Sequence, residues 1–527
     1  MGIYINPGNE SFEEAVTSEI YVDKSELICF TNTMLRTLGK YICVSRPRRF
    51  GKSVNLNMLS AYYSKGSDSR EMFETLKLAG TKDWDRHLNQ YNVIQLNMQD
   101  FLSSSHSMTE LLSLLKKTLI RDFKRSYRQY PDIDYDNELS FCMEEIYAED
   151  GIPFIILIDE WDCIFREHRE DRKAQEQYLN FIRNWLKDKR YVALVYMTGI
   201  LPIKKYGTHS ALNMFDEYSM ADSGKITGCT GFTEDEVNAL CTKYNMDIRQ
   251  MRYWYDGYQL NDHTHLYCPR SVVAAILRKN YSNYWSRTET YEALSKYISM
   301  DMDGLHEVAR QLLAGQNVKI DINTFQNDMT SLNSCDDVLT LLVHLGYLSY
   351  LRDTEEVYIP NKEVRHEFVT AMRAEGKWHK TIDAIQQSKE LLNLTVNGRT
   401  DEVAAQIERI HRENCDPMHY NSEDALRFVV LLAYFYARET YTIIQEMPSG
   451  NGYADILLLP NFQNPTGIPI IIELKYNKSA DSAISQIKDR HYPDVVRDYE
   501  RILLVGIAYD KESADKKHTC LIEEWVK

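Results

Sequence analysis

The sequence lacks three features that would each indicate a particular class of protein. Its ten cysteines are scattered singly, without a Cys-x-x-Cys pair, so we expect neither a disulfide framework nor a zinc site. Its longest apolar run, 428–437, is shorter than the roughly 20 residues that a membrane-spanning helix needs. Its first residues lack the basic stretch and apolar core of a signal peptide. We therefore expect a cytoplasmic protein that does not enter a membrane.

Positive charge is also scarce. The chain has 61 Lys and Arg against 77 Asp and Glu, a formal net charge of -16. This charge repels nucleic acid at long range, so binding would need a local basic groove or metal ions that bridge to phosphate. The net charge alone does not exclude a nuclease.

Apolar residues are plentiful, and the chain is long enough for several domains. Of 527 residues, 44% are hydrophobic, and at roughly 100 to 200 residues per domain we expect about three domains. Apolar strand patterns alternate with amphipathic helical patterns in the first part, which predicts a parallel sheet with helices on both faces. The expected strands are 41–45, 93–97, 154–159 and 192–197.

Helical patterns dominate the middle of the chain, and strand patterns return near its C-terminal end. We therefore predict an α/β domain at 1–229, a mostly helical lid or connector at 230–390, and a second α/β domain at 391–527.

Gly51-Lys52-Ser53 lies between an expected strand and an expected helix. Backbone amides at a helix N-terminus, an ammonium and a hydroxyl can together hold phosphates and a metal ion. The general phosphate-loop pattern is broken, because Arg46 replaces its first glycine. Downstream, Asp159-Glu160 ends an apolar strand, as the metal-holding Asp and water-activating Glu of nucleoside triphosphatases do. Thr198, after the next strand, is a candidate sensor of the terminal phosphate, although a surface threonine is nearly as good an explanation.

A second polar group lies near the C-terminal end. Asp455 lies on one expected strand, and Glu473 and Lys475 share a face of the next, because side chains alternate along a strand. The two carboxylates can bind magnesium, and Lys475 can position the nucleophile or stabilise a charged transition state. Glu-x-Lys alone is common on exposed strands. The interpretation as a nuclease site therefore depends on the apolar strands and the helix that surround it.

Two further signals are weaker. A basic, aromatic stretch at 116–130 could follow a nucleic-acid backbone, although a solvated helix face is the commoner explanation. The cluster 254–258 could form a peptide or base platform, although packing between lid and core is favoured.

Several motifs together resemble the bacterial AAA-ATPase-like proteins that carry a C-terminal nuclease domain. These motifs are Tyr21-Val22-Asp23-Lys24, Arg46-Pro47-Arg48-Arg49-Phe50-Gly51-Lys52-Ser53, Leu157-Ile158-Asp159-Glu160-Trp161-Asp162, Thr198-Gly199-Ile200, Trp254-Tyr255-Asp256-Gly257-Tyr258 and Ile359-Pro360-Asn361. The region around Asp455 and Glu473-Leu474-Lys475 resembles the PD-(D/E)XK nuclease superfamily.

The resemblance implies an AAA-like P-loop domain that binds ATP and Mg²⁺. Its loop would comprise Arg46, Arg49, Phe50, Gly51, Lys52 and Ser53, with Asp159 at the metal, Glu160 as the base and Thr198 near the phosphate. No residue is identified as an arginine finger. Trp161 replaces the tyrosine that relatives commonly have.

The resemblance also implies a restriction-endonuclease-like domain at the C-terminal end. In it Glu423 is an auxiliary metal ligand, Glu446 lies on the preceding strand, and Gln486 and Tyr492 lie near the substrate backbone. Relatives usually have Gly-Arg-x-Asp, whereas this chain has Tyr453 in place of the arginine, which would weaken a phosphate contact without removing a metal ligand.

The expected function is ATP binding, with hydrolysis, coupled to magnesium-dependent cleavage of nucleic acid, most readily DNA, by a protein that could form a homo-oligomer. One alternative is a nucleotide-binding sensor or assembly platform with little hydrolysis and a non-catalytic nuclease-like domain. Another is a structural pseudoenzyme, against which the intact charged residues of both sites argue.

Overall fold

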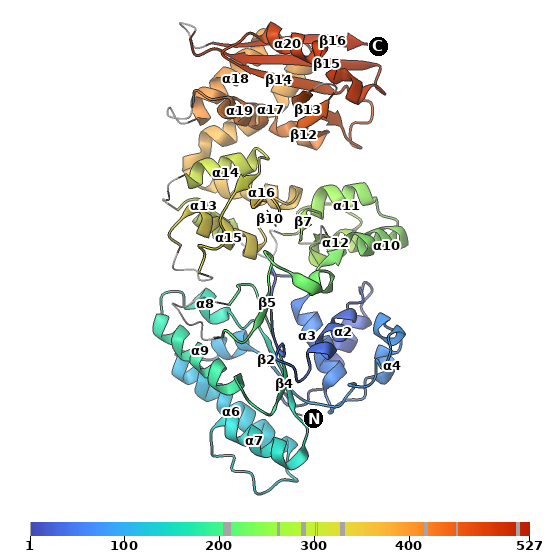
Figure 1. Cartoon of the computed structure of the whole chain (residues 1–527), viewed down its shortest axis with the longest axis vertical. Coiled ribbons are helices and arrows are strands. Elements are labelled where there is room, and N and C mark those ends of the chain that lie inside the picture. The colour runs from blue at the N-terminus through green and yellow to red at the C-terminus, as the bar shows by residue number, and fades with distance from the viewer. Residues whose placement is uncertain are drawn as a thin grey trace. The chain divides into compact units, whose positions relative to one another are not determined.

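The computed structural model describes residues 2–203, 212–260, 264–285, 291–300, 302, 304–326, 332–415, 420–449, 452–512 and 517–527 (Figure 1). The chain divides into two compact units, Met1–Thr290 with Lys319–Val364, and Tyr291–Val318 with Arg365–Lys527. The region 230–390, which the sequence analysis assigned to one connector, is therefore shared between the two units. Each unit consists of two segments that are distant in sequence. Local sequence patterns do not reveal that such segments pack together.

The first unit is built on a parallel sheet with the strand order β2-β3-β4-β1-β5. The strands are β1 (Tyr41–Ser45), β2 (Asn92–Asn97), β3 (Phe154–Asp159), β4 (Val192–Gly199) and β5 (Asp216–Tyr218). β1, β3 and β4 are buried along their whole length, as expected for strands covered on both faces. The predicted parallel sheet is confirmed.

Helices cover both faces of this sheet (Figure 1). On one side lie α1 (Glu10–Val16), α2 (Glu26–Met34), α3 (Lys52–Tyr63), α4 (Arg70–Phe73) and the short turn η1 (Lys77–Gly80). The other covering helices are α5 (Met98–Ser103), α6 (Met108–Ser126), α7 (Leu139–Asp150), α8 (Cys163–Glu167) and α9 (Arg172–Leu186).

The rest of the first unit is helical with short strands. Its helices are α10 (Glu234–Tyr244), α11 (Ile248–Tyr255), α12 (Pro269–Arg278), α15 (Cys335–Leu345) and the turn η2 (Gly224–Cys229). One small sheet has the order β6-β8-β7, from Phe232–Thr233, His265–Tyr267 and Tyr258–Gln259, and another has the order β10-β11-β9, from Ser349–Leu351, Glu356–Tyr358 and Val318–Lys319.

The cluster 254–258 packs inside this part of the fold. Tyr255 and Tyr258 are buried, and Gly257 has φ +121 with Pro360 O only 1.9 Å from where a Cβ would stand. Tyr358 Oη donates to Gly257 O at 2.8 Å. The cluster is thus a tight packing motif, as the sequence analysis favoured.

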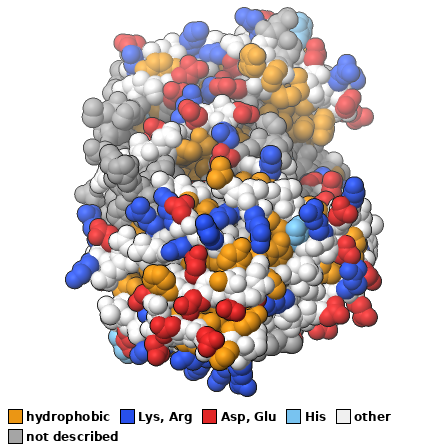
Figure 2. Space-filling model, turned by 60° about the horizontal axis from the view of Figure 1, so that its bottom comes forward, with side chains coloured by type: hydrophobic (Ala, Val, Ile, Leu, Met, Phe, Trp, Pro, Cys, Tyr) orange, Lys and Arg blue, Asp and Glu red, His pale blue; other side chains and the backbone are white. Residues whose placement is uncertain are grey.

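The basic stretch is also largely explained by packing. Phe123 and Tyr127 are buried, while Lys116 pairs with Glu138 at 2.9 Å and Lys124 lies 3.7 Å from Asp136. On the face shown in Figure 2, basic and acidic side chains are intermingled. The buried rings of Phe123 and Tyr127 are therefore not available to stack on bases.

The second unit packs helices on a mixed sheet with the order β12-β13-β14-β15-β16. β14 and β15 are parallel and the other neighbours are antiparallel. The strands are β12 (Tyr441–Ser449), β13 (Gly452–Pro460), β14 (Ile470–Tyr476), β15 (Arg501–Tyr509) and β16 (His518–Val526).

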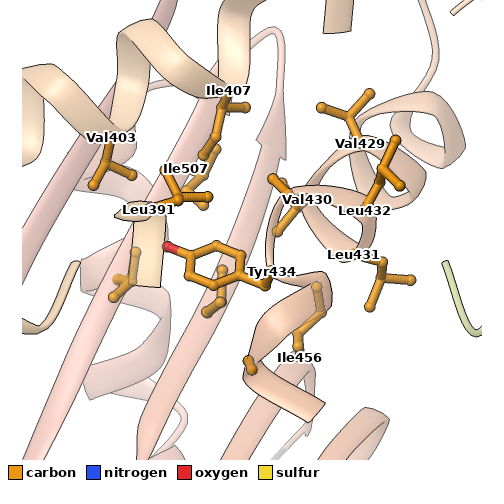
Figure 3. Packing of buried hydrophobic residues seen from close by; sticks show 14 of the residues in the cluster. Leu391, Val403, Ile407, Val429, Val430, Leu431, Leu432, Tyr434, Ile456 and Ile507 are labelled. Atoms are coloured by element: carbon orange, nitrogen blue, oxygen red, sulfur yellow. The ribbon is translucent and has the colours of Figure 1, made fainter. Parts of the chain in front are cut away.

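The helices of the second unit supply its core. They are α13 (Tyr291–Ile298), α14 (Leu305–Leu313), α16 (Lys362–Ala374), which begins in the first unit, α17 (His379–Val396), α18 (Thr400–Asn414), α19 (Glu423–Ala433) and α20 (Ala480–Asp489), with the turns η3 (Gly376–Trp378), η4 (Phe435–Glu439) and η5 (Tyr492–Val496). Figure 3 shows Leu391, Ile407 and Val430 from three helices near Ile456 and Ile507 of the sheet. Within the described residues, no helix is long and apolar enough to cross a bilayer.

Side-chain caps stabilise the first turns of α19 and α20, the two helices that flank Asp455 and Glu473. Ser422 Oγ accepts from Ala425 N at 3.0 Å at the start of α19, and Ser479 Oγ accepts from Ser482 N at 3.2 Å at the start of α20. Each bond satisfies an amide that the first helical turn leaves without a partner. α19 accordingly begins directly after Ser422.

Two candidate active sites

The first site lies where β1 meets α3. Gly51 takes the left-handed conformation, φ +86, and α3 begins at Lys52. Because β1 and β3 both neighbour β4 in a parallel sheet, the loop and the end of β3 reach the same edge. Ser53 Oγ accordingly donates to Asp159 Oδ2 at 2.5 Å. A cavity of about 540 Å³ opens beside these two residues, lined also by Asn57, Gln95 and Asn97.

The loop encloses the Lys52 ammonium. Lys52 Nζ donates to Arg46 O at 3.1 Å and to Pro47 O at 2.9 Å. Burial lowers the pKa of Lys52, while the nearby carboxylates of Glu160 and Asp159 act in the opposite direction. The site therefore concentrates a cation and two carboxylates at a helix N-terminus, where backbone amides favour anions.

Glu160 is held by an arginine that the sequence analysis missed. Glu160 has φ +51, and its Oε2 accepts a hydrogen bond from Arg166 Nη2. Burial raises the pKa of Glu160, and the charge of Arg166 opposes this shift. Arg166 lies on α8, four residues after Asp162, and this spacing is a signal that could have identified its ion pair with Asp162, but not its contact with Glu160.

Asp162 connects this turn to the end of β4. Its Oδ2 accepts from Ile200 N at 3.1 Å and Leu201 N at 2.8 Å, and lies 3.2 Å from Arg166 Nε. A Cβ at Gly199 would lie 2.6 Å from Asp162 Oδ1. Thr198, at the same strand end, is buried, and its hydroxyl has no hydrogen-bond partner within the described chain.

Two loop side chains predicted to bind the cofactor instead have protein partners. Arg46 is completely buried. Its Nε donates to Thr230 Oγ1 at 3.0 Å, and its Nη1 donates to the carbonyls of Ser45 and Tyr218, each at 2.9 Å. The ring of Phe50 is buried edge-on to that of Tyr258, 5.3 Å between centroids. Arg49 is exposed. The side chains of Arg46 and Phe50 thus fix the loop in place, whereas that of Arg49 is exposed to solvent.

The second site lies in a fork between β13 and β14. The two strands pair from Ile456 with Ile472 to Leu458 with Ile470. One residue further, at Asp455 and Glu473, this pairing ends, while β14 stays paired to β15 through Tyr476. Asp455 Oδ2 instead accepts from Leu474 N at 2.7 Å. The fork therefore brings the two predicted carboxylates together.

Glu473 is the most buried of the charged groups in the fork. Its side chain is 2% exposed, and its Oε1 accepts from Lys475 Nζ at 2.7 Å and from Gln486 Nε2. Burial, with the charge of Asp455, raises its pKa to about 7, against the effect of Lys475. Its Oε2 is buried without a hydrogen-bond partner in the described residues.

These features fit a divalent cation. A cation between Asp455 and Glu473 would satisfy the second oxygen of Glu473 and offset the repulsion between the two charges. The described residues contain no group of three or more His, Cys, Asp or Glu suited to a metal ion. Such an ion would take its remaining ligands from water or substrate, as Mg²⁺ commonly does.

The other predicted residues surround the fork at different depths. Gln486 lies on α20 and donates to Tyr492 Oη at 3.1 Å. Tyr492 is buried in η5, after α20 rather than on it, and its hydroxyl is 2.9 Å from where a Cβ of Gly452 would stand. Glu423 is exposed at the first residue of α19. Arg427 of α19, which no sequence motif indicated, contacts Glu446 and Asp455.

Two family models match this chain. The model described as a predicted AAA-ATPase, AAA-ATPase-like, matches residues 7–208. The model of the PD-(D/E)XK nuclease superfamily matches residues 422–519. The first match contains the Lys52 loop and the Asp159 strand end, and the second contains the fork.

One curated protein and two solved structures are similar over longer stretches. An "Uncharacterized protein in vnfD 5'region" from Azotobacter chroococcum mcd 1 is 23% identical over 282 residues, 51% of this chain and 51% of that protein. The match thus spans about half the length of that relative. The ORC2 protein of Aeropyrum pernix, solved as ADPNP-ADP complexes, is 11% identical, with 68% of this chain and 98% of that chain covered and a TM-score of 0.32. PCH-2 of C. elegans is 11% identical, with 64% and 70% covered and a TM-score of 0.22.

Proposed function

We propose that this chain, whose residues 7–208 match the AAA-ATPase-like model and whose residues 422–519 match the PD-(D/E)XK nuclease superfamily, is a nucleotide-regulated, magnesium-dependent nuclease. The observation that carries the proposal is the fork at Asp455 and Glu473, in which one buried carboxylate oxygen has no partner within the described chain. The proposed substrate is nucleic acid, most readily DNA.

The residues of the fork have separate roles in this proposal. Asp455 and Glu473 hold the metal ion, and Gln486 fixes the orientation of Glu473 through its hydrogen bond. A bound Mg²⁺ neutralises charge that develops on the phosphate and lowers the pKa of an attacking water. Lys475, 2.7 Å from Glu473 Oε1, supplies a positive charge that can orient the water or stabilise the transition state.

The nucleotide site takes ATP with Mg²⁺ in the same proposal. The backbone amides after Gly51 and the Lys52 ammonium bind phosphate, and the Ser53 hydroxyl and Asp159, already in contact, hold the metal ion. Glu160 orients and deprotonates the water. The bond to Arg166 uses Glu160 Oε2, and the charge of Arg166 lowers the pKa of Glu160, so Glu160 is a stronger base once it leaves Arg166.

Two contacts support nucleotide regulation. Phe50 packs on Tyr258, and Arg46 bonds to Thr230, so the phosphate loop is attached to the helical part of the first unit. The boundary between the units falls within α16. A loop that shifts on binding phosphate would therefore move residues that lead along the chain to the second unit.

The test is cleavage of supercoiled, linear and single-stranded DNA and of RNA by the full chain, with Mg²⁺ and with or without ATP. We expect Asp455→Ala and Lys475→Ala each to lower the cleavage rate by about 100-fold or more. Asp481→Ala, an exposed carboxylate on α20, is the matched control and should cleave normally. Cleavage that survives in both site variants would show that the fork is not the active site.

One contact favours a second function. The ion pair of Arg166 with Glu160 restrains the residue that would activate water, as expected of a static nucleotide sensor with little hydrolysis. Phosphate release that is lost in Glu160→Gln, with ATP binding kept, would exclude this alternative. Slow release that rises in Arg166→Gln would show instead that the contact restrains hydrolysis.

A further inference from the structure

Arg427 lies at the fork without a role in the proposed chemistry. Its side chain, 19% exposed, reaches from α19 to two carboxylates. Its Nη1 pairs with Glu446 Oε1, and its Nη2 lies 3.5 Å from Asp455 Oδ1. The sequence offers no cation at position 453, where Tyr453 is 65% exposed. A guanidinium from another element thus lies beside Asp455.

The contacts of Arg427 with Glu446 and Asp455 are weak enough for a ligand to replace them. A separation of 3.5 Å is at the limit of hydrogen bonding, and the Glu446 side chain is 65% exposed, so the pair is weakly held. Arg427 Nε is buried without an acceptor in the described residues. The guanidinium therefore has unused donors, and its planar fork suits two phosphate oxygens.

The charges at the fork show what Arg427 does for each ligand. Glu446, Asp455 and Glu473 face two cations, and Lys475 is already bonded to Glu473. Arg427 is the cationic side chain in contact with Asp455 in the described part of the chain. Its charge opposes a metal ion at Asp455 and attracts a phosphodiester to the same place.

We propose that Arg427 is a substrate-binding residue, which holds Asp455 until a metal ion takes that carboxylate and then binds a backbone phosphate of the nucleic acid. The inference rests on the proposed nuclease function. It assigns to α19 the phosphate contact that Tyr453 does not provide, and it makes metal affinity and substrate affinity respond in opposite directions to the same charge.

The test is to measure two affinities in the full-length Arg427→Gln variant. Mn²⁺ binding is followed by calorimetry, and binding of fluorescent single-stranded and duplex oligonucleotides is followed by anisotropy with Ca²⁺ present. We expect Mn²⁺ to bind more tightly to Arg427→Gln than to wild type. The oligonucleotide that the wild type binds better should bind the variant about tenfold more weakly. The slope of the logarithm of its affinity against the logarithm of the salt concentration should be smaller by about one. Arg501→Gln removes one charge from the start of β15 and should change neither affinity.

Two further variants keep the test decisive if Arg427→Gln does not fold. Arg427→Lys should retain Mn²⁺ affinity and most of the oligonucleotide affinity. Tyr453→Arg, at an exposed position, should weaken Mn²⁺ binding and strengthen oligonucleotide binding, and in the Arg427→Gln background it should restore the latter. Tyr453→Arg shifting neither affinity would overturn the proposal.

The outcomes separate this inference from the function on which it rests. Wild-type protein that binds both ligands, with Arg427→Gln weakening both or neither, overturns the role of Arg427 alone. A fall in both affinities would mean that Arg427 only supports the fold. Wild-type protein that binds no nucleic acid overturns both the proposed function and the inference.

Discussion

At the scale of single residues, buried charge marks both sites. Arg46 is completely buried, and Lys52, Asp159 and Glu473 are nearly so. A charge removed from water is costly unless partners replace the lost hydration. Burial lowers the pKa of Arg46 to about 10 and raises that of Glu473 to about 7. The surroundings of the two charges differ. Arg46 is bonded mainly to uncharged groups, whereas Glu473 lies beside a second carboxylate.

Arg46→Met should destabilise the first unit by about 3 kcal/mol, because Thr230 and two carbonyls lose a buried donor. Urea denaturation in the absence of nucleotide measures the change. Arg49→Met, in the same loop but exposed, should stay within about 0.5 kcal/mol of wild type. Equal stabilities of the two variants would contradict the assigned role of Arg46.

Glu473→Gln should bind no Mn²⁺ and yet be more stable than wild type by about 1–2 kcal/mol at pH 8. The wild-type carboxylate is ionised there although it is buried beside Asp455, and the amide removes that cost. Denaturation in EDTA gives the stability, and calorimetry gives the metal binding. A less stable variant would show that the bond to Lys475 outweighs the burial of charge.

At the scale of elements, a histidine pair joins α18 to β16. His411 Nε2 is 3.0 Å from the Tyr420 carbonyl, which can only accept. His411 Nδ1 therefore accepts from His518 Nε2, 2.7 Å away, and His518 Nδ1 is left without a proton. Burial lowers the pKa of His411 to about 4, and burial with the neighbouring His411 lowers that of His518 to about 3.

This pair should make the second unit sensitive to acid. Both folded-state pKa values lie below the ordinary value of about 6.5, so the unfolded chain binds more protons and stability falls as pH decreases below about 6.5. The free energy of unfolding should drop by about 3 kcal/mol for each histidine, and so by about 6 kcal/mol for the pair, between pH 7 and pH 4. His411→Asn/His518→Phe should lose less stability over that range. If the free energies of unfolding of the wild type and the double variant fall in parallel with pH, the histidine pair is not the cause of the acid sensitivity.

The turn after α11 depends on one glycine. Gly257 combines φ +121 with a backbone oxygen 1.9 Å from where a Cβ would stand. Gly257→Ala should therefore destabilise the first unit by about 3 kcal/mol or more. Gly151→Ala is the matched control, since Gly151 also has positive φ but open space around it, and should cost about 1 kcal/mol. Thermal denaturation of both variants would show whether the close contact adds to the strain.

At the scale of the whole molecule, each unit has its own apolar cores and one candidate site. We expect two thermal transitions in calorimetry. Mg-ATP at 100 times its dissociation constant should stabilise the first unit by about 2.7 kcal/mol, and Lys52→Ala should abolish this shift. An ATP shift of both transitions, rather than of one alone, would indicate that the units unfold together.

The sequence by itself predicted the parallel sheet, and it identified the loop at Gly51-Lys52-Ser53 and the two carboxylates that the structure brings together in the fork. Long apolar runs identify buried strands, and a polar motif at a strand end keeps its place in any fold that pairs those strands. It could not predict that 291–318 joins 365–527, or that Arg166 reaches Glu160 and Arg427 reaches Asp455. These depend on how separate segments pack, and a long side chain can reach many partners until packing selects one. Only the tertiary structure showed that both sites hold their key carboxylates against an arginine.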